Sequence, residues 1–210
     1  MIQEEKKVLI ESLRYKGIRD ERVLDAFRKV PRERFVAEPL RRYAYEDNAL
    51  PIPCMQTISQ PFTVAYMTMA LNVQEGNKVL EVGSGSGYQA AILCELGAEV
   101  YTVERIEKLY KSAKELLESL GYKVNFKLGD GSKGWEEQAP YDRIIVTAGS
   151  PAVPQPLIEQ LGFGKLVIPV GTLENQKLYE ITKTTEGLGF KLHESFKFVP
   201  LIGEEGWRQE

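Results

Sequence analysis

A glycine-rich loop is the part of the sequence whose residue types best suit chemistry. Residues 83–87 read Gly-Ser-Gly-Ser-Gly, and they follow the short apolar run 79–82. Glycines between a strand and a helix let backbone N–H groups approach a ligand closely, because no Cβ is in the way. Taken alone, such a loop also fits a tight turn that binds nothing, so its surroundings must decide.

The spacing of the glycines favours one cofactor over another. The dinucleotide fingerprint is G-x-G-x-x-G, whereas here the third glycine, Gly87, comes one position early and Tyr88 takes the fingerprint position. An acidic residue, Glu81, also precedes Gly83 by two positions. This E-x-G-x-G-x-G form resembles the S-adenosyl-L-methionine loop of class I methyltransferases, and it disfavours a dehydrogenase.

Two further acidic residues are expected at the same edge of the fold. Glu104 lies 21 residues after Gly83, where a carboxylate could accept hydrogen bonds from both ribose hydroxyls or simply cap the next helix. Asp130, followed by Gly131, could accept the adenine amino group or form an ordinary Asp-Gly turn. Because open α/β sheets bind ligands at the carboxyl ends of their strands, the three sites support one another.

The elements that would position these residues alternate regularly. A helical stripe with apolar residues at positions 106, 109, 110, 113, 116, 117 and 120 ends at Gly121. Strands separated by helices predict an α/β fold with a doubly wound, mostly parallel, Rossmann-like sheet. The predicted strands are the apolar runs 79–82, 100–103, 124–128, 143–147 and 166–170.

We expect one domain over residues 1–210, made of a helical N-terminal part, residues 1–75, a cofactor-binding core, residues 76–175, and a hairpin with a tail, residues 176–210. In the N-terminal part Val8, Leu9 and Leu13 form a short apolar stripe. Asp20 can cap a second helix that stops at Val30-Pro31, and Pro61 suits the first turn of a third.

Two strand-like runs, 176–184 and 190–199, lack a helix between them and predict a C-terminal antiparallel hairpin. Strict alternation places Phe190, Leu192, Phe196 and Phe198 on one face. It places the chain's single histidine, His193, on the polar face, where we expect it to be solvated.

Composition excludes several classes of function. One histidine and two separated cysteines, Cys54 and Cys94, do not make a zinc site, and they suit a reducing compartment. A net charge of −3 argues against binding nucleic acid through bulk positive charge. No apolar stretch approaches the ~20 residues that span a bilayer. We therefore expect a cytoplasmic protein that binds no metal, no nucleic acid and no membrane.

The sequence from residue 30 to near the C-terminus resembles the protein-L-isoaspartate O-methyltransferase family. The glycine loop is common to many methyltransferases, whereas the Thr-Ile-Ser segment is the more specific part. The resemblance lies in residues 56–61, 64, 65, 67, 79–91, 103–105, 129–131, 135, 141–148, 168–171 and 198–201.

The resemblance implies methyl transfer from S-adenosyl-L-methionine to the free carboxylate of L-isoaspartyl residues in aged proteins, and it leaves D-aspartyl residues open as a second substrate. The product cofactor would be S-adenosyl-L-homocysteine, and the ester would collapse to a succinimide that partly returns aspartate. Ser59 would lie at the transfer site. The implied cofactor-binding residues are Thr57, Ile58, Glu81, Gly83, Ser84, Gly85, Gly87, Glu104, Asp130 and Gly131.

The chemistry agrees with a site that has no histidine. A carboxylate is already ionised at pH 7, so it needs no general base. Ser59 would orient it with a hydrogen bond, although the same serine could cap the helix that begins at Pro61. Val199, Pro200 and Leu201 could pair with the substrate backbone, or they could simply pack as a terminal strand.

Two other functions remain open from the sequence. One is methylation of a different acceptor, although residues 147–151, Thr-Ala-Gly-Ser-Pro, lack the Asn/Asp-Pro-Pro-Tyr/Phe motif of amino-methylating DNA enzymes. The other is a module that binds the cofactor without catalysis. We expect a monomer whose partners are damaged proteins and peptides, and no role is assigned to residues 202–207.

Overall fold

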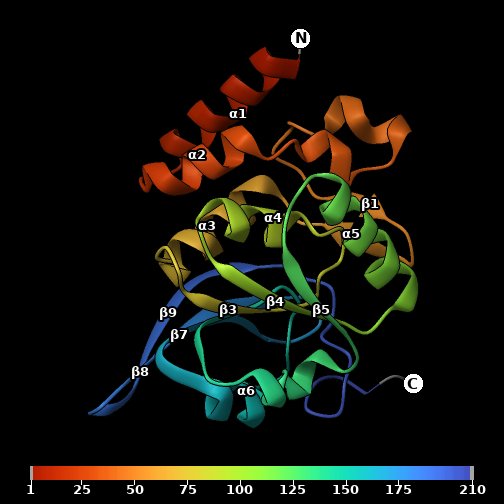
Figure 1. Ribbon diagram of the computed structural model, residues 1–210. Coiled ribbons are helices and arrows are strands. Elements are labelled where there is room, and N and C mark those ends of the chain that lie inside the picture. The colour runs from red at the N-terminus through yellow and green to blue at the C-terminus, as the bar shows by residue number, and fades with distance from the viewer. Residues whose placement is uncertain (1, 209–210) are drawn as a thin grey trace.

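A seven-stranded sheet forms the centre of the protein in the computed structural model, which describes residues 2–208 (Figure 1). The strand order is β5-β4-β3-β6-β7-β8-β9; the first five are mutually parallel, and β8 pairs antiparallel with both β7 and β9. This confirms the predicted α/β fold. The strands are β3 (Lys78–Val82), β4 (Glu99–Glu104), β5 (Val124–Leu128), β6 (Tyr141–Val146), β7 (Leu161–Gly171), β8 (Gln176–Thr184) and β9 (Gly187–Phe196).

Helices cover both faces of the sheet, and two more lie on the outside of one layer. Figure 1 shows α3 (Pro61–Leu71), α4 (Tyr88–Glu95) and α5 (Glu107–Ser119) above the sheet, with α6 (Gln155–Gln160) below it. Successive residues of β3 pack on opposite faces of the sheet. Val79 belongs to the hydrophobic core on the side of α3 and α4, and Leu80 belongs to the core on the side of α6. The remaining helices, α1 (Ile2–Tyr15) and α2 (Glu21–Lys29), stack at the top.

The N-terminal part follows most of its local signals. The Asp20 side chain accepts a hydrogen bond of 2.9 Å from the Arg22 N–H, which caps α2 as predicted, and α2 ends at Val30. The prediction for Val8 was wrong, because Val8 is exposed and Ile10 is buried beside Leu9 and Leu13. Short elements then lead to α3: η1 (Arg32–Phe35), η2 (Glu38–Tyr43), β1 (Leu50–Ile52) and β2 (Gln56–Ile58).

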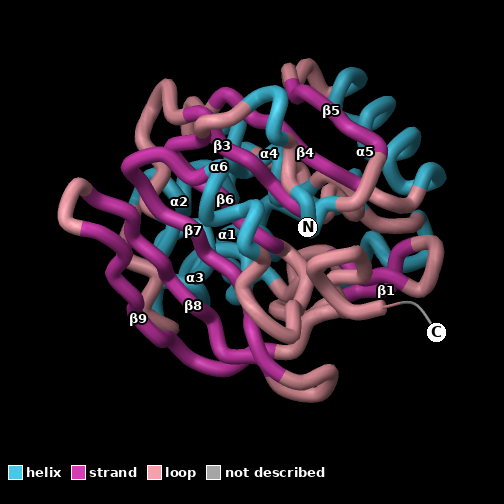
Figure 2. Tube along the Cα trace, turned by 90° about the horizontal axis from the view of Figure 1, so that it is seen from below, coloured by secondary structure: helices cyan, strands magenta, loops and turns pink. Residues whose placement is uncertain are grey.

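The C-terminal hairpin is antiparallel as predicted, but the residues on its buried and exposed faces differ from the prediction. Phe190 and Leu192 are 63% and 54% exposed, although Phe198 is buried. The pairing of β8 with β9 shifts between Lys177 and Tyr179, so an extra residue on β9 reverses the alternation beyond it. Figure 2 shows β9 at the outer edge of the sheet.

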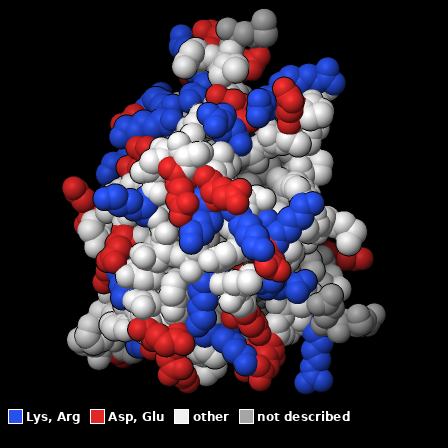
Figure 3. All heavy atoms as spheres, turned by 45° about the vertical axis from the view of Figure 1, so that its right-hand side comes forward, with Lys and Arg blue, Asp and Glu red and all other residues white. Residues whose placement is uncertain are grey.

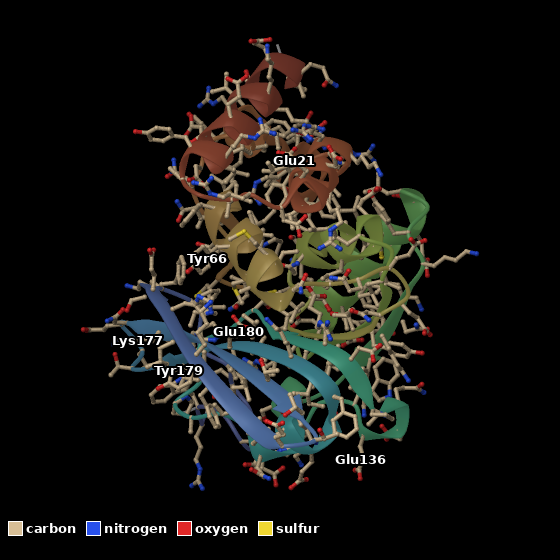
Figure 4. The ribbon with its side chains drawn as sticks, turned by 90° about the vertical axis from the view of Figure 1, so that its left-hand side faces the viewer. Glu21, Tyr66, Glu136, Lys177, Tyr179 and Glu180 are labelled. Carbon is tan, nitrogen blue, oxygen red and sulfur yellow. The ribbon has the colours of Figure 1, made fainter. Side chains whose placement is uncertain are left out.

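His193 is therefore inward, and the prediction that it is solvated was wrong. Its side chain is 8% exposed. The Tyr66 hydroxyl lies 3.1 Å from its Nδ1, and its Nε2 lies 2.8 Å from Oε2 of Glu180. In Figure 4 Tyr66, on α3, lies close to the strand that carries Glu180. The histidine thus joins α3 to the hairpin and lies outside the glycine loop.

Candidate active site

A cavity opens at the carboxyl ends of β3, β4 and β6. The strand order reverses at β3, because the chain winds outward to β4 on one side and to β6 on the other, and this switch point is where open α/β sheets bind ligands. The cavity holds about 900 Å³ of space, including its open mouth.

The glycine loop forms one wall of this cavity. Gly83 has φ +94°, and a Cβ on it would lie 2.6 Å from the Thr147 hydroxyl oxygen. Gly87, with φ +87°, is the residue before the first turn of α4. Residues that carry a Cβ rarely adopt these backbone angles, so the loop requires glycine at these two positions. Gly83, Ser84 and Gly85 line the cavity, whereas Gly87 does not, and the N–H groups of Gly83 and Gly85 donate to the Val103 carbonyl and to Glu104.

Glu104 lies at the end of β4 with its carboxylate beside the loop. It is 5% exposed and lines the cavity. Its Oε2 accepts a hydrogen bond of 2.9 Å from the Gly85 N–H, and its Oε1 accepts one of 2.9 Å from the Ile106 N–H. Each oxygen keeps a second lone pair for a ligand hydroxyl. The capping role and the ligand role predicted for Glu104 are therefore compatible.

Glu81 lies beneath the loop and does not line the cavity. It is fully buried, and its Oε2 accepts a hydrogen bond of 2.5 Å from Thr102, whose hydroxyl lies 2.7 Å from that of Ser84. Its Oε1 has no partner among the described residues. Burial raises the pKa of Glu81 to about 8, despite the bond from Thr102. Glu81 thus supports the loop from behind, through Thr102 and Ser84.

Asp130 also lies outside the cavity lining. Its Oδ1 accepts hydrogen bonds from the Ser132 N–H and hydroxyl, and its Oδ2 accepts one of 2.8 Å from the Glu204 N–H. The carboxylate therefore closes a turn and also holds the C-terminal tail, a role that its local sequence did not predict. Gly131 does line the cavity, and a Cβ on it would lie 2.6 Å from the Val82 side chain.

Ser59 faces this cavity from the junction of β2 with α3, beside Thr57 and Ile58. Gln60 is the residue before α3 and makes no side-chain cap, while the carboxylate of Asp47 accepts a hydrogen bond of 2.7 Å from the Phe62 N–H. The proposed cap by Ser59 was therefore wrong. Among the described residues, no hydrogen bond involves the Ser59 hydroxyl.

The opposite rim is formed by Val199, Pro200 and Leu201, which line the cavity together with Ile202. Gly149 pairs with this segment, because the Gly149 N–H donates to the Val199 carbonyl and the Leu201 N–H donates to the Gly149 carbonyl, both at 2.8 Å. One edge of the segment is thus packed against the protein. Pairing with a substrate backbone stays a prediction for its other edge.

Several lining residues were not predicted from the sequence. The Thr147 hydroxyl lies 2.7 Å from the Gly83 carbonyl oxygen and 3.0 Å from that of Val82, so it ties the end of β6 to the glycine loop. Its position directly after β6, at the carboxyl edge of the sheet, was the available signal. The other unpredicted lining residues include Gln56, Met67, Tyr88, Gln89, Arg105, Ile106, Leu109, Ala148, Phe198 and Ile202.

Charges elsewhere are mixed. Figure 3 shows Lys and Arg interspersed with Asp and Glu over one face of the molecule. Within residues 2–208, no group of His, Cys, Asp and Glu could hold a metal ion, and none of the helices is both long and apolar enough to cross a bilayer. The glycine loop without side chains, the Glu104 carboxylate and the close backbone at Gly131 all fit an adenosyl group bound at a sheet edge. The fold and site therefore define a doubly wound α/β protein of the class I methyltransferase type.

Comparison with known proteins narrows the class to a family. The family model for protein-L-isoaspartate(D-aspartate) O-methyltransferase matches residues 4–206. The Dictyoglomus thermophilum protein-L-isoaspartate O-methyltransferase is 52% identical over 208 residues, which cover 98% of this chain and 94% of the relative. The Chlorobaculum tepidum enzyme of that name is 52% identical over 210 residues, covering 99% and 98%. The chain belongs to the protein-L-isoaspartate(D-aspartate) O-methyltransferase family.

Solved structures agree with this assignment. A protein-L-isoaspartate O-methyltransferase superimposes with a TM-score of 0.85 at 32% identity, covering 96% of this chain and 67% of the other. A Plasmodium falciparum family member, solved with S-adenosyl-L-homocysteine, gives a TM-score of 0.80 at 26% identity and covers 93% and 97%.

Proposed function

We propose that this protein transfers a methyl group from S-adenosyl-L-methionine to the free carboxylate of L-isoaspartyl residues in damaged proteins and peptides. The observation that carries the proposal is the Ser59 hydroxyl, which faces the same cavity as the glycine loop and has no partner among the described residues. A serine that neither caps a helix nor bonds within the described chain is available to a ligand. Family membership supports the same acceptor.

The cofactor residues follow from the geometry of the cavity. We assign the cofactor's ribose to Glu104, and its methionyl portion to the space beside the loop at Gly83 and Gly85, where the backbone can approach a ligand closely. Thr57 and Ile58 would flank the cofactor beside Ser59. Gly131 would admit the adenine ring close to the strand, while Glu81 and Asp130 act indirectly, through the loop and the tail.

The residues need to position rather than activate the acceptor. The bound cofactor supplies an activated methyl group on a sulfonium. The acceptor carboxylate is ionised at neutral pH and is already nucleophilic, so no proton has to be removed. Ser59 would donate a hydrogen bond that fixes the carboxylate in line for attack, and the rim at Val199–Leu201 would help to exclude water. The methyl ester product then cyclises to a succinimide as the backbone nitrogen of the following residue displaces methanol, and hydrolysis of the succinimide partly restores aspartate.

The remaining parts of the proposal concern the setting of the enzyme. We propose a cytoplasmic monomer that accepts damaged proteins and peptides and binds no nucleic acid. Support comes from the two free cysteines, from the mixed surface charge in Figure 3 and from the net charge of −3. D-aspartyl residues are proposed as a second acceptor because the matching family is described by both substrates.

The decisive experiment offers labelled S-adenosyl-L-methionine with matched peptides that contain either isoaspartate or aspartate. We expect base-labile label on the isoaspartyl peptide alone. Label on neither peptide, with S-adenosyl-L-homocysteine still bound, would favour a binding module. Label on another class of molecule would favour a different acceptor.

A variant then tests the serine. Ser59→Ala should lower kcat/KM about tenfold or more, because a hydrogen bond to a charged acceptor is lost. The affinity for S-adenosyl-L-homocysteine should hardly change. Ser195→Ala, on the exposed part of β9, is the matched control and should keep full activity. Undiminished turnover in Ser59→Ala would contradict the proposed role.

A further inference from the structure

A buried arginine, Arg32, lies directly behind the Ser59 segment. Its side chain is fully buried, although it lies 27 residues from Ser59 in the chain. Its Nη2 donates a hydrogen bond of 2.9 Å to the Ser59 carbonyl oxygen, and its Nε donates one of 2.9 Å to the Ala44 carbonyl. A longer contact of 3.4 Å joins Nη2 to the Asn48 carbonyl. The guanidinium thus joins two segments, the loop at residues 44–48 and the segment that carries Ser59.

The same guanidinium also contacts a second residue that lines the cavity, Tyr88. Its central carbon lies 4.8 Å from the centre of the Tyr88 ring. Tyr88 is the first residue of α4, directly after the glycine loop, and it lines the cavity. Arg32 therefore touches both the Ser59 segment and the start of the helix that follows the cofactor loop.

The charge of Arg32 is costly to bury. Within the described chain its three hydrogen bonds go to uncharged carbonyls, and Nη1 is buried with no partner. Burial lowers the pKa of Arg32, although an arginine stays protonated at neutral pH. Among the described residues no carboxylate forms a direct ion pair with Arg32, although the negative charge of Asp47 offsets part of the cost of burying it. Such local costs concentrate at functional sites.

We propose that Arg32 is a positioning residue for the transfer reaction. It fixes the backbone of Ser59 relative to the cofactor loop, and its positive charge, which the nearby Asp47 carboxylate offsets only in part and without a direct ion pair, favours an anionic acceptor beside Ser59. This inference rests on the proposed function, since it concerns the same acceptor carboxylate. Arg32 does not line the cavity, so it acts through Ser59 and through its field rather than by touching substrate.

The test separates acceptor binding from cofactor binding. Arg32→Met should raise KM for the isoaspartyl peptide about tenfold or more, because a buried charged hydrogen bond is lost, while the Kd of S-adenosyl-L-homocysteine changes less than about threefold. Arg32→Lys keeps the charge and should fall between Arg32→Met and the wild type. Arg22→Met is the control, because Arg22 also donates to a backbone carbonyl, that of Val73, outside the cavity lining.

Two further measurements keep the inference falsifiable. Free guanidinium, below denaturing concentration, should restore part of the activity of Arg32→Ala, since it can refill the space left behind. Amide hydrogen exchange of residues 56–62 should rise in Arg32→Lys and Arg32→Met, and this needs no activity at all. If the wild type methylates no isoaspartyl peptide, the proposed function fails, and the exchange data still decide whether Arg32 holds the Ser59 segment.

The opposite results would overturn the proposal. In one, the KM for peptide and the Kd of S-adenosyl-L-homocysteine both rise in proportion to the loss of folded protein. Arg32 would then have only a structural role. The other is unchanged exchange of residues 56–62 in both variants. If Arg32→Met does not fold, the Arg32→Lys variant and the guanidinium experiment give the answer.

Discussion

Replacing Glu104 with Gln changes one atom and tests the core of the cofactor site. The Glu104 carboxylate accepts one N–H on each oxygen, from Gly85 and from Ile106. A glutamine has only one acceptor oxygen, so whichever way its amide turns, one of these N–H groups faces an NH₂ group and loses its partner. Glu104 is 5% exposed, so water cannot easily take over.

The structure sets the size of two separate effects. An unsatisfied buried donor costs about 1–3 kcal/mol, which the free protein should show as a Tm lowered by roughly 3–10 °C. The ribose hydroxyls, in addition, would lose a charged acceptor. Hydrogen bonds to charged groups contribute about 1.5–3 kcal/mol, so the Kd of S-adenosyl-L-homocysteine should rise about 10- to 150-fold.

Isothermal titration with S-adenosyl-L-homocysteine and thermal unfolding without ligand measure these two effects. Glu99→Gln is the matched control, because Glu99 lies exposed at the other end of β4 and accepts only the Tyr101 hydroxyl among the described residues. It should leave the Kd unchanged. If Glu104→Gln lowers the Tm but binds within about threefold of wild type, Glu104 is a structural cap and the assignment to ribose is refuted.

Three other perturbations follow from the geometry and the titrating groups. Gly83→Ala should lower S-adenosyl-L-homocysteine affinity more than about tenfold in titration, because its φ is +94° and its Cβ would lie 2.6 Å from the Thr147 hydroxyl; Gly76→Ala, at φ +79° with open space around it, should bind normally. The folded pKa of Glu81, raised by burial to about 8, means that its stabilising contribution is complete below the usual value of 4.5 and declines as the pH rises to about 8. Glu81→Gln should therefore gain stability relative to wild type in urea unfolding at pH 9 but not at pH 4, and an equal effect at both would contradict this. For Glu180, burial alone raises the pKa, but hydrogen bonds from a lysine and a histidine outweigh it and leave the pKa below 4.5. Its contribution is thus present above pH 4.5 and lost as the pH falls further, so Glu180→Gln should flatten the acid limb of the stability profile; an unchanged acid limb would show that this carboxylate is not responsible.

Local signals in the sequence determined where the elements begin and end. Asp20 caps α2 through the N–H of Arg22, only two residues away, and Pro61 begins α3 because its fixed φ suits a first turn. The glycine loop was found for the same reason. A strand followed by residues with positive φ and then by a helix involves a few neighbouring positions, so the sequence alone could predict it.

The roles of individual side chains depended on partners that are distant in the chain. Within residues 2–208 the Ser59 hydroxyl has no hydrogen bond, and Asp47 takes the helix N–H that a capping serine could have bound. Asp130 holds the N–H of Glu204, 74 residues later. Neither pairing has a periodic or local signature, because each arises only when loops from different parts of the chain meet at one edge of the sheet.

The single histidine, His193, also shows the difference between what local sequence predicts and what tertiary contacts decide. Alternation along the strand was a sound guide to the face of each residue until the bulge in β9 reversed it. The sequence by itself determined the α/β fold, the order of its elements and the residues of the cofactor loop, because these rest on hydrophobic period and backbone conformation. Only the tertiary structure decided which polar groups are satisfied, because hydrogen-bond partners are set by packing between distant segments.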